Sequence, residues 1–419
     1  MSEYGRGATI LSAGIASTGL VTFAYFSVAS HVLPDDQYAS ISLLWSVLFV
    51  TVTVLYRPIE QLLSRTIADR RARGVEHDLP LRTPLLLQGG FALGFLAVAL
   101  LLRDPIRDDL LGGSSALYAI LVVAVLAYAA SYFARGWLAG HQWFALYGGL
   151  VFLEATSRLL FAVAVAVGIA EGQTAVALGM AAAPLVSLVV VPLAFRRRPP
   201  ATGRGRRRGG DDLGLARGGR FALAVLVIMI AEQTLLNAAV LTTELTVTDA
   251  AVAGFVFNVL LIARAPLQLF QAVQGSLLPH LAGLEAADDR GAAARAIRVT
   301  LLAIAGFSAA VALGLLVLGP WAMDVLFDDR ASYGRWGLAL VAVGMGLHLA
   351  AGTFNQAALA RDDAVRAAAA WVVAAVAFVA WMVSPVIDDR LVRTEVGYAG
   401  AAALLCVLLA VVYSVRREG

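Results

Sequence analysis

The sequence predicts an all-α polytopic membrane protein with twelve transmembrane helices, divided into two sets of six. Three observations predict this fold class. Hydrophobic residues make up 60% of the 419 residues and charged residues only 15%, whereas soluble domains carry about 25% charged residues. The apolar residues form runs long enough to span a bilayer. Most of the positive charges fall between these runs, predominantly in the loops of one side.

The apolar runs define the individual helices. A spanning helix needs about 20 mostly apolar residues. In chain order, the segments that meet this need are 8–32, 39–63, 84–102, 116–134, 147–169, 174–195, 221–241, 250–273, 298–318, 336–357, 366–384 and 395–414. Helices are expected because backbone amides in lipid must be satisfied within the segment. The long Ala, Leu and Val runs lack the alternation of β-barrel strands.

The basic residues, all arginine, delimit these segments and predict their orientation. With the N-terminus inside, 23 of the 32 fall on the inner side and six on the outer side, as the positive-inside rule predicts for an even number of helices. The inner set is Arg6, Arg65, Arg70, Arg71, Arg73, Arg82, Arg135, nine residues from Arg196 to Arg220, Arg290, Arg295, Arg298, Arg361, Arg366, Arg416 and Arg417; the outer set is Arg103, Arg107, Arg330, Arg335, Arg390 and Arg393. We therefore expect a multi-pass protein of the cytoplasmic membrane with both termini in the cytoplasm.

The composition also bears on partners and cofactors. The net charge of +3 comes from the inner loops and favours the anionic lipids of the inner leaflet over nucleic acid. The single Cys406 excludes an internal disulfide and a cysteine metal cluster, and the five histidines form no H-x-x-x-H pair. No cofactor is expected. The chain lacks a P-loop, a G-x-S-x-G elbow and an H-E-x-x-H motif, and its outer loops are short, so we expect no enzyme.

A Gly/Pro/Arg-rich segment divides the twelve spans into two sets of six. It predicts an N-terminal bundle (1–195), a cytoplasmic linker (196–220) and a C-terminal bundle (221–419). The fourth and tenth spans end in similar sequences, Leu138 to Gln142 and Leu359 to Asp363. Such repeats are typical of secondary transporters. The alternative is chance similarity among Ala/Leu-rich helices.

Charged residues within the spans are the candidates for function, because they usually face a protein interior or a water-filled cavity. Glu154 and Arg158 are four residues apart, so they either neutralise each other or leave Arg158 to meet an anionic ligand. Glu232 is either a proton or cation site or a protonated packing residue. Glu60 and Glu154 are further candidates for ion coupling.

Two spans carry a polar stripe suited to a phosphorylated glycan. Arg57 and Glu60 lie on one stripe of the second span. On the eighth span the corresponding residues are Asn258, Arg264, Gln268 and Gln271. Arginine suits bidentate phosphate contact and amides suit sugar hydroxyls. The alternative for Arg57 is that its side chain snorkels to the lipid headgroups.

Several short motifs resemble a known family. His31 to Tyr38 (HVLPDDQY), Ser42-Leu-Leu and Glu60 to Arg65 (EQLLSR) resemble the start of O-antigen-type lipid-linked oligosaccharide flippases, within the multidrug/oligosaccharidyl-lipid/polysaccharide exporter superfamily. Four further segments resemble later parts of the family's sequences. They are Arg135-Gly136-x-Leu138-x-Gly140-x-x-x-Phe144, Glu154 with Arg158, Leu278-Pro279, and Asn355-Gln356 to Leu359-Ala360. The chain departs from the family at Ala39, where glycine is common.

The resemblance implies a fold of two pseudo-symmetric six-helix bundles around a central cavity. It also implies a transporter that flips a polyprenyl-diphosphate-linked oligosaccharide or related glycolipid across the membrane by alternating access. Its cell-surface polysaccharide pathway would supply glycosyltransferases or a polymerase as further partners. Two alternatives stay open: a cation-coupled multidrug antiporter of the same superfamily, and a non-transporting scaffold or glycan-processing protein. An antiporter would favour an acidic cavity, whereas the spans hold three arginines against Glu60, Glu154 and Glu232.

Overall fold

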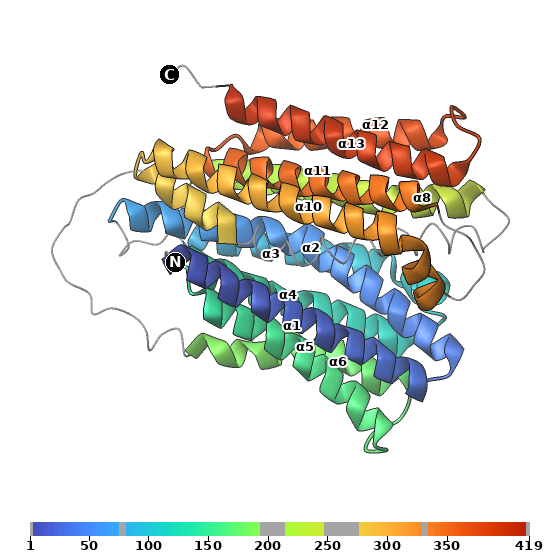
Figure 1. Cartoon of the computed structure of the whole chain (residues 1–419). Coiled ribbons are helices and arrows are strands. Elements are labelled where there is room, and N and C mark those ends of the chain that lie inside the picture. The colour runs from blue at the N-terminus through green and yellow to red at the C-terminus, as the bar shows by residue number, and fades with distance from the viewer. Residues whose placement is uncertain (1–2, 75–80, 193–213, 247–275, 328–333, 416–419) are drawn as a thin grey trace. The chain divides into compact units, whose positions relative to one another are not determined.

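The structure, a computed structural model, describes residues 3–74, 81–192, 214–246, 276–327 and 334–415 (Figure 1). All regular elements among these residues are helical. They are α1 (Glu3–Val32), α2 (Asp35–Ala72), α3 (Arg82–Leu101), η1 (Pro105–Leu110), α4 (Ser115–Gly140), α5 (Phe144–Ala166), α6 (Gly172–Ser187), η2 (Leu188–Val190), α8 (Leu215–Thr246), the helical residues 276–286, α10 (Arg290–Phe327), α11 (Arg335–Ala360), α12 (Ala364–Val383) and α13 (Arg390–Ser414). They belong to two compact units, Met1–Leu226 and Val227–Gly419.

The helices agree with the predicted spans. In the described part of the chain, ten are long and apolar enough to cross a membrane, and each overlaps a predicted span. Predicted span 8–32 lies within α1, and 250–273 lies outside the described residues. Large apolar side chains such as Leu93 and Leu101 are exposed, as expected for surfaces that face lipid.

Some helices are longer than the apolar runs that predicted them. α2 and α10 each contain 38 residues, which at 1.5 Å per residue is about 57 Å, against about 30 Å of hydrocarbon. α4 continues to Gly140 rather than ending near residue 134. Arg135, assigned to the inner side by its charge, is therefore part of a helix. α8 begins at Leu215, inside the predicted linker 196–220. Most of this linker lies outside the described residues, so the predicted domain limits stay a prediction.

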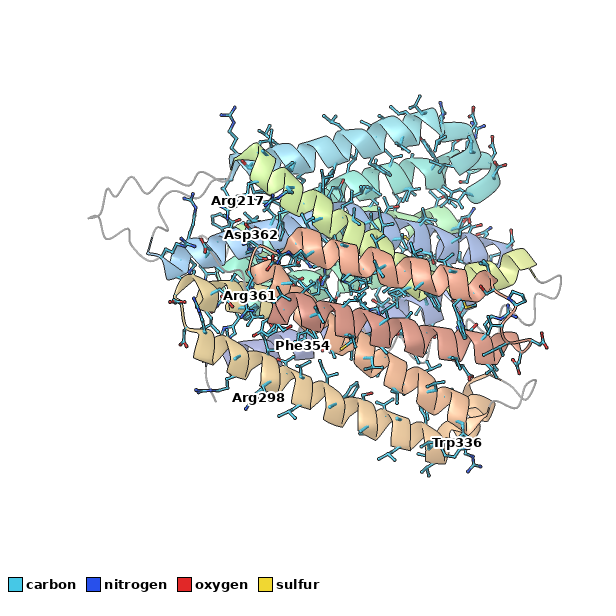
Figure 2. All side chains as sticks on the ribbon, turned by 90° about the horizontal axis from the view of Figure 1, so that it is seen from above. Arg217, Arg298, Trp336, Phe354, Arg361 and Asp362 are labelled. Atoms are coloured by element: carbon cyan, nitrogen blue, oxygen red, sulfur yellow. The ribbon has the colours of Figure 1, made fainter. Side chains whose placement is uncertain are left out.

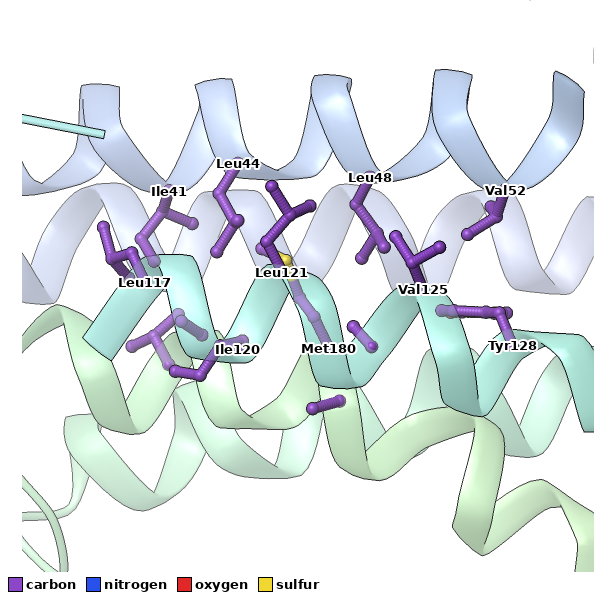
Figure 3. Packing of buried hydrophobic residues seen from close by; sticks show 14 of the residues in the cluster. Ile41, Leu44, Leu48, Val52, Leu117, Ile120, Leu121, Val125, Tyr128 and Met180 are labelled. Carbon is purple, nitrogen blue, oxygen red and sulfur yellow. The ribbon is translucent and has the colours of Figure 1, made fainter. Parts of the chain in front are cut away.

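The first unit has an apolar core between α1, α2, α4, α5 and α6. Ile41, Leu44 and Leu48 recur at helical spacing on α2 and face Leu117 and Leu121 of α4 (Figure 3). Met180 of α6 closes the same layer. The core fixes α2, α4 and α6 around the polar groups described below.

The two units share an internal repeat. α4 and α11 begin at residues 115 and 335 and end at 140 and 360, a constant offset of 220. Both end in the same turn: the Trp143 amide donates to Leu138 O (2.9 Å) and the Asp363 amide to Ala358 O (2.9 Å). Gln142 and Asp362 have positive φ there. The shared backbone geometry supports the predicted repeat over chance similarity and corrects its offset by one residue.

Each unit also contains a polar contact across that turn. Arg71 Nη1 donates to the His141 carbonyl at the end of α4 (2.6 Å). Arg361, at the end of α11, donates from Nε to Glu285 Oε1 of helix 276–286 (2.8 Å). The arginine therefore comes from the second helix in one unit and from the fourth in the other. In both, it joins the ends of two neighbouring helices.

Candidate functional site

The first unit contains a buried cluster of charged and hydroxyl side chains, which we call the Glu154 cluster. Its members are Glu154 (α5), Arg135 and Ser131 (α4) and Ser187 (α6). Arg135 Nη2 and Ser131 Oγ donate to separate oxygens of the Glu154 carboxylate, and Ser187 Oγ lies 3.4 Å from Oε1. Glu154 is only 2% exposed. A buried carboxylate with this many donors is compensated as an anion.

A second buried carboxylate lies nearby on α2. The Tyr147 hydroxyl of α5 donates to Glu60 Oε1 at 2.8 Å. The other oxygen, Oε2, has no hydrogen-bond partner among the described residues. Arg135 and Arg57 both lie within electrostatic reach of Tyr147. The two acids and two arginines thus form a nearly neutral interior, in which Glu60 retains a free acceptor.

Glycines bring these elements close together. A Cβ on Gly136 would lie 2.8 Å from the Glu60 carbonyl, and one on Gly140 would lie 2.6 Å from Ile67 Cβ. The Gly-x-x-x-Gly spacing lets α4 approach α2 closely, as small residues do between membrane helices. The residues of the Arg-Gly-x-Leu-x-Gly motif therefore have structural roles: the arginine forms an ion pair with Glu154, and the two glycines let α2 pack closely against α4.

Arg158 lies in a different environment from Glu154, although one turn of α5 separates them. Its Nη1 donates to the Tyr128 hydroxyl at 2.7 Å. Its Cζ lies 4.7 Å from the ring centroid of Trp45 and 5.6 Å from that of Phe49, within cation–π range. Its Nε has no acceptor among the described residues. Of the two alternatives for this pair, mutual neutralisation of Arg158 and Glu154 is not observed, because Arg135 from α4 forms the ion pair with Glu154.

In the second unit, Glu232 of α8 faces a histidine. His348 Nε2 of α11 lies 3.7 Å from Glu232 Oε1, an ion pair only when the imidazole is protonated. The His348 ring packs edge-on against Trp371, whose Nε1 donates to Asn355 Oδ1 at 3.1 Å. His348 is buried, and its Nδ1 has no partner in the described part of the chain. Two titratable side chains from different helices therefore lie close together in a largely apolar interior.

The structure places the predicted residues unevenly. Glu60, Glu154 and Arg57 lie around Arg135 and Tyr147 in the first unit. Arg158 lies in the same unit but contacts Tyr128, Trp45 and Phe49 instead, and Glu232 lies in the second unit. Asn258, Arg264, Gln268 and Gln271 lie outside the described residues. Among the described residues, no three His, Cys, Asp or Glu side chains gather as metal ligands.

Sequence reasoning missed two charged partners, Arg135 and His348. The charge count places Arg135 on the inner side, just after the fourth predicted span, yet it follows this apolar run without any turn signal. His348 lies in the middle of the tenth span, where an ionisable residue is itself a functional signal. The phenols Tyr128 and Tyr147 were equally visible as polar groups within apolar runs, but only the fold shows which charges they contact.

Comparison with known proteins identifies the fold. No protein-family model matches the sequence, and no curated protein does so either. Solved structures do match, over nearly the whole chain. A MATE transporter of Vibrio cholerae, VcmN, is 13% identical with a TM-score of 0.77, covering 98% of this chain and 95% of that one. The MATE transporter ClbM in complex with Rb⁺ gives 13% and 0.78, covering 99% and 96%.

A third match is a transporter of the MOP superfamily from Pyrococcus furiosus, for which a binding pocket of reverse polarity is described as suggesting a different function. It is 12% identical with a TM-score of 0.71, covering 98% of this chain and 93% of that one.

The predicted fold class is confirmed: an all-α polytopic membrane protein with twelve transmembrane helices in two bundles. The superfamily named from the motifs is compatible with this fold; for this chain, membership of the superfamily and of its O-antigen-type branch stays a prediction.

Proposed function

We propose that the chain is a secondary membrane transporter that flips a polyprenyl-diphosphate-linked oligosaccharide, or a related glycolipid, across the cytoplasmic membrane by alternating access. The observation that carries the transporter proposal is the fold, which follows MATE-type structures over 98% of the chain. The flippase branch is supported by the motifs around Glu60 and between Arg135 and Arg158. Cell-surface polysaccharide biosynthesis would be the pathway served.

Arg158 supports an anionic cargo. A buried guanidinium is costly unless an anion compensates it. Arg158 has aromatic neighbours and a neutral phenol but no carboxylate partner among the described residues, and its Nε–H lacks an acceptor there. A diphosphate would supply both the charge and the acceptor. We propose phosphate contact also for Arg57 and for Arg264, with the amides of Asn258, Gln268 and Gln271 as sugar contacts.

Energy for uphill movement would come from an ion gradient or from removal of the product at the outer face, since the sequence has no P-loop motif. The Glu232–His348 contact supports ion coupling, because a carboxylate and an imidazole 3.7 Å apart within a span are the kinds of side chain that transporters use to bind a proton or a cation. Glu60, with its free oxygen, is a further candidate. Glu154 is a weaker one, because Arg135 already holds it as an anion.

The second candidate is a cation-coupled multidrug antiporter. One similar structure is a multidrug resistance MATE family transporter in an outward-facing conformation, 13% identical with a TM-score of 0.71. The Glu232–His348 pair would serve such an antiporter equally well. The two candidates differ in cargo charge: a diphosphate lipid needs arginine, and a cationic drug needs an open carboxylate.

One assay distinguishes the two candidates. Proteoliposomes would be loaded in parallel with a fluorescent lipid-linked diphosphate sugar and with a cationic dye. We expect flipping of the sugar lipid, and a loss of about tenfold or more in Arg158→Gln, because a charge-assisted contact contributes about 1.5–3 kcal/mol. The control is Arg73→Gln, an exposed arginine paired with Asp69. Dye export without sugar flipping would favour the antiporter.

A further inference from the structure

Helix α10 has two distinct faces. Ala293, Ile297 and Ile304 are buried at spacings of four and seven residues, and this face packs against α11. The opposite face carries Val299 and Leu302, which are 60% and 66% exposed, and continues to Leu313 and Val317. In a membrane protein, such an exposed apolar face is covered by lipid.

Two arginines continue this lipid-facing surface beyond its apolar part. Arg295 and Arg298 are exposed and lie one turn before Val299 and Leu302, on the same face. Among the described residues, neither forms an ion pair. Arg290, one turn and a half earlier, differs because its Nε lies 3.0 Å from Asp288 Oδ1. In the part of α10 whose side chains are described, the unpaired positive charge therefore lies on the exposed apolar face.

The length of the helix places these two arginines at the level of the headgroups. Residues 299–318 are uncharged and at 1.5 Å per residue extend about 30 Å, which matches the hydrocarbon thickness of a bilayer. At the far end of this stretch, the start of α11 presents Trp336, 76% exposed. Tryptophan is enriched at membrane interfaces. Arg298 and Trp336 lie toward opposite ends of α10 (Figure 2).

We infer that Arg295 and Arg298 form a binding site for the phosphate of an acidic phospholipid, such as phosphatidylglycerol. A guanidinium pair on a lipid-covered face fits a phosphodiester by charge and by bidentate geometry. The acyl chains would lie along Val299, Leu302 and the apolar face beyond them. The site is on the outer surface of the second unit, so it is independent of the cargo proposal.

Native mass spectrometry of the full chain, delipidated and titrated with phosphatidylglycerol or phosphatidylcholine, tests this site. The site variant carries Arg295→Gln and Arg298→Gln. The control carries Arg73→Gln and Arg290→Gln; these arginines are exposed and already have Asp69 and Asp288 as partners. Each variant replaces two arginines, so both variants lose the same charge. We expect the site variant to bind phosphatidylglycerol at least about tenfold more weakly and the control to remain within about twofold of wild type.

Three outcomes would overturn the inference. Equal weakening in both variants would mean that only the net charge attracts the lipid. Equal binding of phosphatidylcholine by the wild type would remove the preference for an acidic headgroup. Wild-type binding by the site variant would remove these residues from any lipid site. Because both residues are exposed, thermal unfolding of the site variant should match wild type, which separates binding from folding.

Discussion

At the scale of single residues, the buried charges are arranged by neighbouring helices and not by their own. Glu154 is neutralised by Arg135 across α4 and α5, while Arg158, on the same helix as Glu154, is held by aromatic rings and a phenol. The consequence for mutagenesis is specific. Removing Arg135 leaves a buried, uncompensated carboxylate, whereas removing Arg158 does not.

This difference can be measured by a double-mutant cycle. We expect Arg135→Gln to lower the free energy of unfolding by about 3–5 kcal/mol, because it strands Glu154. Arg135→Gln combined with Glu154→Gln should recover much of that loss. Thermal or denaturant unfolding in detergent would give the coupling energy. Additive effects of the two substitutions would mean that the pair is not coupled.

The Glu232–His348 contact yields a second prediction at this scale. We expect Glu232→Gln to leave lipid-linked glycan binding largely intact while transport no longer responds to an imposed proton or sodium gradient, because the amide cannot exchange a proton. Proteoliposome flux with and without the gradient is the measurement. Glu171→Gln, at the start of α6, is the matched control. Unchanged gradient dependence in Glu232→Gln would identify Glu232 as a packing residue.

At the scale of elements, the contact between α2 and α4 determines the geometry of the polar interior. Gly136 and Gly140 let the two backbones approach, and Glu60 lies at the point of contact with Gly136. A helix of larger residues would separate α2 from α4. Tyr147 and Glu154 are both on α5, whereas their partners Glu60 and Arg135 are on α2 and α4. Moving α2 away from α4 would therefore displace at least one of these two contacts.

We therefore expect Gly136→Ala to destabilise the protein by about 1–3 kcal/mol, the usual cost of overpacking. The added Cβ would lie 2.8 Å from a backbone oxygen that cannot rotate away. Gly149→Ala on α5 is the control, because a Cβ there meets nothing within 4 Å; it should be neutral or slightly stabilising. Equal melting temperatures of the two variants would contradict close packing of α4 on α2.

At the scale of the whole molecule, charge distribution predicts topology. Reporter fusions after residues 75, 210 and 288 should report the cytoplasm, and those after 108, 331 and 390 the outside. The physical reason is that arginine-rich loops are retained on the inner side, and nine arginines lie between Arg196 and Arg220. An outside signal at residue 210 would contradict the orientation and the twelve-helix count.

The sequence by itself determined the class and the helices. Apolar runs of bilayer length and the arginines between them are local signals, so the helices could be assigned without any tertiary information. Helix ends were less predictable: α2, α4 and α10 continue beyond their apolar runs, because a helix does not have to end where the hydrocarbon does.

The tertiary structure alone decided which charges meet. Glu154 pairs with Arg135, 19 residues away, and Glu232 with His348 on another helix. Sequence spacing gives the neighbours of a residue on its own helix, but the rotation and register of packed helices decide its neighbours on the others. In an interior where an unpaired charge is expensive, those contacts between helices determine which groups remain free for a ligand.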